Sequence, residues 1–198
     1  MIIIRFWRCI FVMKRIVSLV LFFVLGFVVT TEAAVVNSVK NIGIVIVGSE
    51  DFQSEKYFNA ARDIVKPLND GMSIEVGELM QSKYRKYCEE KGISSATPEL
   101  SDLTAFAEQN DFDRVLCLVV EKPTQDEFNR WDGSFVVRIS LQVNAYLCNK
   151  TELIKTHSTG KKKESEFNLL LRSPEVRARI GAFKLCANDI GKAMKGLW

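Results

Sequence analysis

Every second residue between positions 137 and 147 is apolar, and this alternation constrains the fold more than any other feature of the chain. Four of the positions between them carry polar side chains, namely Arg138, Ser140, Gln142 and Asn144. A period of two is the side-chain repeat of a β-strand, so we predict a long strand with one face on a core and the other more hydrated. A turn at residues 148–152 then allows residues 153–159 to return as an antiparallel strand.

Three shorter apolar runs predict further strands, at residues 42–47, 72–76 and 115–120. Apolar residues at helical spacing predict helices in four segments, at residues 57–68, 79–91, 100–107 and 176–197. Strands that alternate with helices in this way predict an α/β protein. We expect a mixed sheet of about five strands, with a C-terminal antiparallel hairpin and helices packed on the sheet.

The ends of three helices carry local signals. Ser173 and Pro174 supply a cap and a first helical residue for the last helix. Gly92 predicts the end of the helix at residues 79–91, because glycine adopts the left-handed conformation that ends many helices. Thr97 and Pro98 predict the start of the helix near residue 100 in the same way as Ser173 and Pro174.

The first residues predict an export signal. Four basic side chains precede an uncharged run at residues 16–31, and Glu32-Ala33-Ala34 follows it. A basic region, an apolar core and small residues are the parts of a secretory signal peptide, and the core is shorter than the about 20 residues that span a bilayer. We predict a signal peptide at residues 1–33 and a single α/β domain at residues 34–198. Either Met1 or Met13 can be the true start.

Charge and cysteine positions limit the partners. Removal of residues 1–33 takes away four of the 27 basic residues and one of the 24 acidic ones, so the remainder is neutral. Nucleic-acid binding needs a positive surplus on one face, so we expect no nucleic-acid partner. No cysteine directly follows the predicted cleavage site, so we expect no permanent membrane anchor. These features predict a periplasmic or secreted protein.

The order strand, helix, strand, helix, strand, hairpin, helix resembles the N-terminal domain of TolB-type periplasmic proteins. It is also similar to the α/β domains of CsgG-type secretion proteins and of penicillin-binding-protein activators. Two segments, Gln81-Ser82-Lys83-Tyr84 and Arg179-Ile180-Gly181-Ala182-Phe183, resemble small uncharacterised exported proteins of diderm Firmicutes. The first two resemblances imply scaffolding in the cell envelope through protein contacts, whereas the third implies no activity.

Acidic residues follow several of the predicted strands, and they are Glu50, Asp51, Glu78 and Glu121. Strand ends in an open α/β sheet can converge on a ligand crevice, so these carboxylates form a candidate site for a cation or an amine. Solvated loop charges are the alternative. The only histidine, His157, has no recognisable nucleophile or zinc-ligand partner in the sequence. We therefore predict no catalytic residue, no metal and no cofactor.

Two cysteines form a candidate disulfide. Cys148 ends the long alternating strand, and Cys186 lies beside the apolar stripe of the last helix. If that helix crosses the strand end, the two thiols can join helix to sheet, provided that their Cα atoms lie within about 7 Å. Two free thiols are the alternative.

Phe128, Trp131 and Phe135 form a candidate partner-binding segment in the long connection before the alternating strand. Large aromatic side chains supply much of the energy of protein interfaces, although these could instead cover a sheet edge. We predict an exported, non-enzymatic binding or assembly module of the cell envelope with a protein partner. The alternative is a small-ligand-binding or enzymatic domain that uses the acidic strand ends.

Overall fold

A computed structural model describes residues 39–48, 50–65 and 71–198, and at Glu50 it describes the backbone alone. The predicted signal peptide at residues 1–33 and the possible start at Met13 lie outside the described residues. Their assignment therefore stays a prediction. None of the described helices is both long enough and apolar enough to cross a bilayer.

The described chain alternates strands and helices, as the sequence predicts. Its first half contains β1 (Asn41–Gly48), η1 (Glu50–Phe52), α2 (Glu55–Val65), β2 (Ser73–Glu75), α3 (Glu78–Lys91) and α4 (Leu100–Gln109). Its second half contains β3 (Arg114–Val120), β4 (Thr124–Asn129), β5 (Phe135–Cys148), β6 (Leu153–Glu166) and α5 (Pro174–Ala193).

The strands form one mixed sheet, which confirms the predicted fold class. β1 lies between β2 and β3 and is parallel to both, whereas β3, β4 and β6 are each antiparallel to β5. β6 pairs with β5 along almost its whole length, from Val136 to Cys148. The other edge of β5 is therefore shared, by β3 at residues 143–148 and by β4 at residues 135–140.

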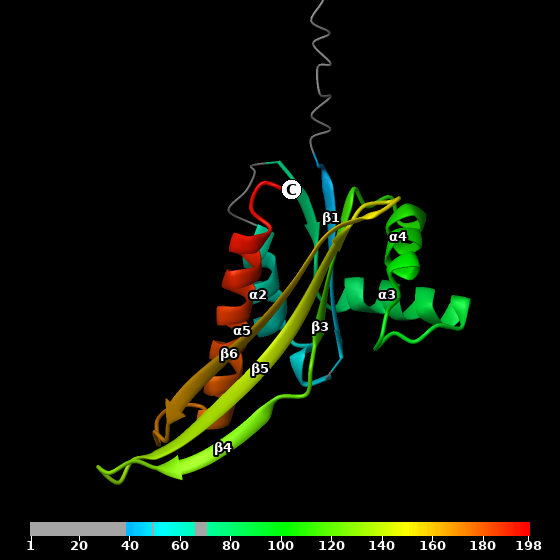
Figure 1. The fold of residues 1–198 in the computed structure, drawn as a ribbon. Helices are drawn as coiled ribbons and strands as arrows, with labels where there is room; N and C mark the ends of the chain where they lie inside the picture. The colour runs from blue at the N-terminus through cyan, green and yellow to red at the C-terminus, as the bar shows by residue number, and fades with distance from the viewer. Residues whose placement is uncertain (1–38, 49, 66–70) are drawn as a thin grey trace, which may run out of the picture. The chain divides into compact units, whose positions relative to one another are not determined.

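The sheet has six strands rather than about five, and the additional strand is β4. Its sequence, TQDEFN, contains a single apolar residue and no apolar alternation, so the sequence predicted a connection there. The pairing of Thr124–Asn129 with β5 makes this segment a strand, and five of its six side chains stay exposed. β4 and the adjoining half of β5 extend past β1 and β3 as an arm (Figure 1).

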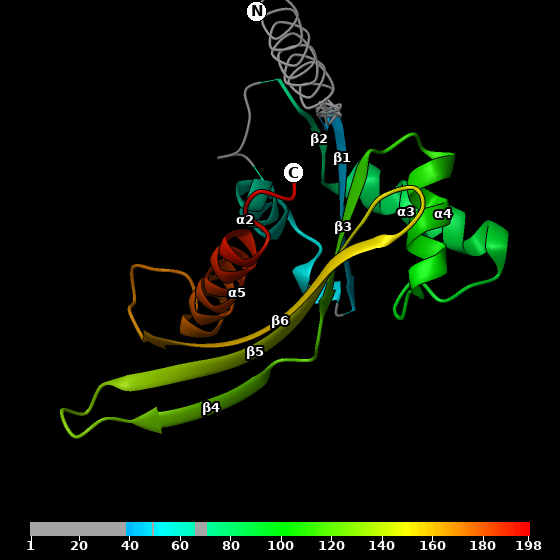
Figure 2. The same cartoon turned by 45° about the horizontal axis from the view of Figure 1, so that its top comes forward.

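Each face of the sheet carries its own hydrophobic cluster. Alternate residues of β1 belong to different clusters, with Ile44 and Ile46 in one and Val45 and Val47 in the other. Helices α2 and α5 cover the first face, and α3 and α4 cover the second (Figure 2). This two-sided burial explains why β1 is a continuous apolar run.

The predicted helix ends are confirmed at two of three places. The Ser173 hydroxyl accepts a hydrogen bond from the Val176 backbone N–H at 3.3 Å, and Pro174 opens α5. Gly92 ends α3 in the left-handed conformation. The predicted start at Thr97 and Pro98 is wrong, because α4 begins at Leu100. There Glu99 is the cap, and it exchanges hydrogen bonds with Asp102 in a capping box.

A polar cluster joins α5 to β6. The Thr159 hydroxyl donates a hydrogen bond of 2.7 Å to Asp189 Oδ2, and both His157 Nε2 and Lys161 Nζ lie 3.3 Å from the same oxygen. The hydrogen bonds from Thr159 and His157 lower the pKa of Asp189 to about 2, because they favour the ionised carboxylate. The cluster therefore stabilises the fold only while Asp189 is charged.

We expect the Asp189→Asn variant to lose about 1 to 2 kcal/mol of unfolding free energy at pH 7, a value reduced for the partial exposure of the carboxylate. The folded-state pKa lies below the unfolded value, so this contribution is full above about pH 4 and disappears as the pH falls towards 2. Urea unfolding between pH 7 and pH 2 measures it, with Asp126→Asn on exposed β4 as the control. A difference that persists unchanged at pH 2 would contradict the assignment.

Candidate functional site

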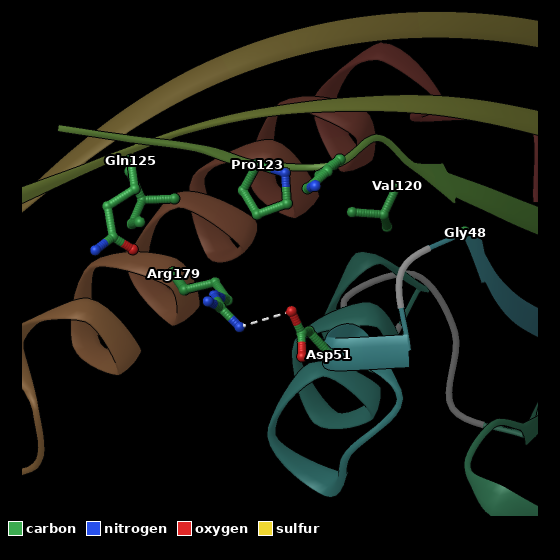
Figure 3. Close-up of a pocket in the computed structure, with 8 residues that line it drawn as sticks. Gly48, Asp51, Val120, Pro123, Gln125 and Arg179 are labelled. Atoms are coloured by element: carbon green, nitrogen blue, oxygen red, sulfur yellow. Dashed lines mark ion pairs between the residues drawn. The ribbon is translucent and has the colours of Figure 1, made fainter.

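An open pocket of about 490 Å³ lies where the central parallel strands β1 and β3 end (Figure 3). Its lining residues come from β1, η1, β3, the connection between β3 and β4, the beginning of β4, β5 and α5, and they are Gly48, Asp51, Val120, Lys122, Pro123, Gln125, Ile139 and Arg179. Ligands of open α/β sheets bind at such carboxyl ends. The pocket therefore lies at the end of two strands, and one of the four predicted acidic residues, Asp51, lines it.

The pocket forms because β1 and β3 end side by side and the segments that follow them run in different directions. Gly48 is the register partner of Val120, the last residue of β3. Beyond this pair, β1 turns into η1, whereas the chain after β3 passes Lys122 and Pro123 and continues along β5 as β4. Gly48 has a φ of 102°, and a Cβ there would lie 2.2 Å from the Val120 carbonyl oxygen. This close approach requires glycine.

Arg179 of α5 places a half-buried cation in the pocket. Its Nη1 lies 3.0 Å from Asp51 Oδ2, and its Nη2 pairs with Glu175 one turn earlier in α5. The Arg179 side chain is 18% exposed, and its Nε is buried with no hydrogen-bond partner among the described residues. Asp51 and Arg179 point towards each other across the opening (Figure 3).

Three aromatic rings hold η1 against α2 and α5 beneath this ion pair. Phe52 lies 4.9 Å from Tyr57 and 5.8 Å from Phe183 between ring centroids, and Tyr57 lies 5.2 Å from Phe183. All three rings are buried. Their packing fixes the residue next to Asp51, so the pocket wall is tied to the core.

The four predicted acidic residues do not form one site. Asp51 lines the pocket, whereas the side chain of Glu50 lies outside the description. Glu121 accepts a hydrogen bond of 3.0 Å from Asn144, and it does not line the pocket. Glu78 begins α3 after β2, and β2 already ends opposite Gly43, well before the end of β1. Within the described residues, no group of His, Cys, Asp or Glu is arranged to hold a metal ion.

The structure does not bring Cys148 and Cys186 together. Side chains of β5 alternate between the two faces of the sheet, so Cys148 packs in the cluster under α3 and α4. Cys186 packs in the other cluster, where its Sγ lies 3.9 Å from the Leu141 carbonyl oxygen. Both thiols are free, and burial raises the pKa of Cys148 to about 12 and that of Cys186 to about 11. The predicted disulfide between Cys148 and Cys186 is therefore wrong, and both residues are buried free thiols.

The three predicted aromatic residues lie along the arm in different surroundings. Trp131, in the turn between β4 and β5, is 99% exposed, and Phe135 is partly exposed at 38%. Phe128 is half-buried under the Arg138 guanidinium, which lies 4.9 Å from the ring centroid. Only part of the predicted segment is therefore available for contact with a partner.

Sequence reasoning missed four apolar residues in the connection between β6 and α5. Leu169 and Leu170 are 87% and 93% exposed, and Phe167 and Leu171 are also exposed. The Phe167 N–H donates a hydrogen bond to the Phe135 carbonyl oxygen at 2.9 Å, which places the first residue of this connection beside the start of β5. We call the β4–β5 turn (residues 130–134), Phe135 and the connection at residues 167–171 the arm end. A Leu-Leu-Leu run without helical spacing was the signal available in the sequence.

Comparisons with known proteins find no matching family model and no matching curated protein. Several solved structures are similar to this chain at low identity. Lipoprotein GNA1162 from Neisseria meningitidis is 11% identical, with a TM-score of 0.42 over 79% of this chain and 99% of that one. The hypothetical protein CT253 from Chlamydia trachomatis is 10% identical, with a TM-score of 0.41 over 78% and 96%. The LpoB C-terminal domain from Salmonella enterica is 12% identical, with a TM-score of 0.34 over 62% and 82%. These scores are too low to assign a family or a function.

Proposed function

We propose that this protein is an exported, non-enzymatic binding module of the cell envelope, and that it contacts another envelope protein through the arm end. In this proposal residues 1–33 are a signal peptide, residues 34–198 are a single α/β domain, and the mature protein is periplasmic or secreted. The expected relationship to TolB-type and CsgG-type domains belongs to the same proposal.

The exposure of Trp131, Leu169 and Leu170 carries the proposal. Single exposed apolar residues are ordinary on protein surfaces, but large apolar side chains that gather at one place mark sites of interaction. Trp131 is fully exposed in the β4–β5 turn, and Leu169 and Leu170 are nearly fully exposed in the separate connection that begins beside Phe135. Tryptophan is among the residues that contribute most binding energy when an interface buries them.

Ion pairs tie the β4–β5 turn of the arm end to β6. Arg130, in the β4–β5 turn, pairs with Glu164 at 2.8 Å and also with Glu166, both on β6. Arg138 of β5 donates to the same Glu164 through Nε at 2.9 Å and Nη2 at 2.6 Å. These hydrogen bonds from Arg138 and Arg130 lower the pKa of Glu164. A surface that is already ordered loses less conformational entropy when a partner binds.

The acidic strand ends do not support the alternative function in its predicted form. An enzymatic or ligand site built on Glu50, Glu78 and Glu121 requires that their side chains face one pocket. Glu78 and Glu121 do not line the pocket at the end of β1 and β3. That pocket has a different composition, with Asp51, Lys122 and Arg179 as its charged groups.

Crosslinking in the intact envelope, followed by capture of this protein, tests the proposal. We expect Trp131→Ala to reduce recovery of the crosslinked partner by about tenfold or more, because buried tryptophan anchors often contribute 2 kcal/mol or more. Leu79→Ala is the matched control, since Leu79 is an exposed leucine of α3, 74% exposed, outside the arm end. Unchanged partner recovery with Trp131→Ala would reject the arm end as the contact surface.

A further inference from the structure

We propose that the pocket at the ends of β1 and β3 binds a ligand that carries a carboxylate on a small apolar body. This site is separate from the arm end, so the inference goes beyond the proposed function and does not depend on it. The pocket meets the arm at its base, through Gln125 of β4 and its register partner Ile139 of β5.

The dimensions and walls of the pocket suit such a ligand. Its volume of about 490 Å³ lies within the range of about 300 to 1,000 Å³ typical of ligand sites. Val120, Pro123 and Ile139 supply an apolar wall, and two of these, Val120 and Ile139, belong to the buried core. Gly48 contributes backbone without a side chain to the lining.

One cation that lines the pocket has no acidic partner among the residues whose side chains the structure describes. Arg179 is paired with Asp51, whereas Lys122 forms no ion pair with any residue whose side chain the structure describes. Lys122 is exposed at the rim and Arg179 is held deeper by α5. One carboxylate on a ligand would balance this charge, and a second cation would not.

Arg179 and Asp51 differ in how firmly they are held. The Arg179 side chain is 18% exposed and is also held by Glu175, whereas Asp51 is 58% exposed and has no second partner among the described residues. Asp51 can therefore turn towards water and leave Arg179 to a ligand carboxylate, which the planar guanidinium matches in shape. Asp51 then competes with the ligand, and Lys122 attracts it.

This competition predicts opposite effects for two exposed substitutions. We expect 3-methylbutanoate to bind the purified protein with a dissociation constant on the order of 1 mM, a level typical of a ligand of this size. Lys122→Met should weaken binding about fivefold or more, because a charge-assisted contact is lost. Asp51→Asn should strengthen it about threefold, because the competing carboxylate is removed. Backbone amide shifts of Gly48 and Gln125 in NMR titrations report the binding.

Matched probes and variants distinguish binding of a carboxylate from binding of a neutral or a cationic ligand. The neutral amide 3-methylbutanamide should bind at least about tenfold more weakly than the acid. Asp63→Asn, which makes the same charge change on exposed α2, should leave the affinity unchanged. Equal binding of acid and amide, the absence of a saturable shift at Gly48, or weaker binding to Asp51→Asn would each overturn the inference. The last result would instead indicate a cationic ligand.

A carboxylate on an apolar body can belong to a free acid or to the end of a peptide chain. An acetylated tripeptide that ends in valine, with its C-terminal amide as control, distinguishes the two. Tighter binding of the free-carboxylate peptide than of 3-methylbutanoate would support the inference with a peptide terminus as the source. Tighter binding of 3-methylbutanoate would support it with a free acid as the source.

Discussion

Replacement of Gly48 by alanine should lower the free energy of unfolding by at least about 3 kcal/mol. Two independent penalties act at this position. The φ of 102° is unfavourable for every residue with a Cβ, and the new Cβ would lie 2.2 Å from the Val120 carbonyl oxygen. That oxygen belongs to the backbone of the paired strand, so it can move only if the β1–β3 ladder is distorted. Urea unfolding monitored by circular dichroism measures the loss.

Gly133→Ala is the matched control for this prediction. Gly133 also has a positive φ, at 81°, but a Cβ there would meet no heavy atom within 4 Å. We expect it to lose only about 1 kcal/mol, the conformational penalty alone. The difference between the two variants isolates the close approach of β1 to β3. Equal losses of unfolding free energy in Gly48→Ala and Gly133→Ala would show that the Val120 carbonyl oxygen leaves room for a Cβ at position 48.

Replacement of Phe183 by alanine should cost about 3 to 5 kcal/mol of unfolding free energy, the usual range for a buried phenylalanine. Its ring is 1% exposed and packs against both Phe52 and Tyr57. The cavity left behind would sit between α5, η1 and α2. We therefore also expect the amides of η1 to exchange with solvent faster, which hydrogen-exchange NMR measures.

Two comparisons test whether the loss in Phe183→Ala comes from the buried ring. Phe183→Leu should lose less than about 1.5 kcal/mol, because leucine keeps much of the apolar volume. Trp131→Ala removes a larger ring at a position that is 99% exposed, and we expect a change within about 0.5 kcal/mol. A loss below about 1 kcal/mol in Phe183→Ala would mean that η1 is not anchored by this ring.

Much of the fold could be predicted because local patterns and tertiary contacts agree. The apolar runs of β1 and β3 are buried on both faces, as continuous apolar strands require. The alternation in β5 places one set of side chains under α5, and the turn at residues 148–152 returns the chain as β6. The cap at Ser173 opens α5 where the sequence predicts it. In each case a few neighbouring residues contain the whole signal.

The candidate site was less accessible from sequence because its parts are distant along the chain. Asp51 follows β1, and its partner Arg179 lies in the last helix. No spacing rule connects them, since they meet only after β5 and β6 bring α5 back over the first face of the sheet. The face assignment of Cys148 is a similar case. The alternation in β5 shows that Cys148 lies on the opposite face from Leu147. Which helices cover that face depends on the packing of the whole chain.

The sequence by itself determined most of the elements, because hydrophobic periodicity is a local property and β1, β3 and β5 are strongly apolar. It also determined that Gly92 ends α3 and that Ser173 begins α5, through backbone preferences of single residues. Only the tertiary structure decided that the polar segment of β4 is a strand, because that segment gains its hydrogen bonds from β5. Only the tertiary structure placed Phe167 beside Phe135 and formed the pocket around Arg179. Both depend on strand pairing between residues far apart in the chain.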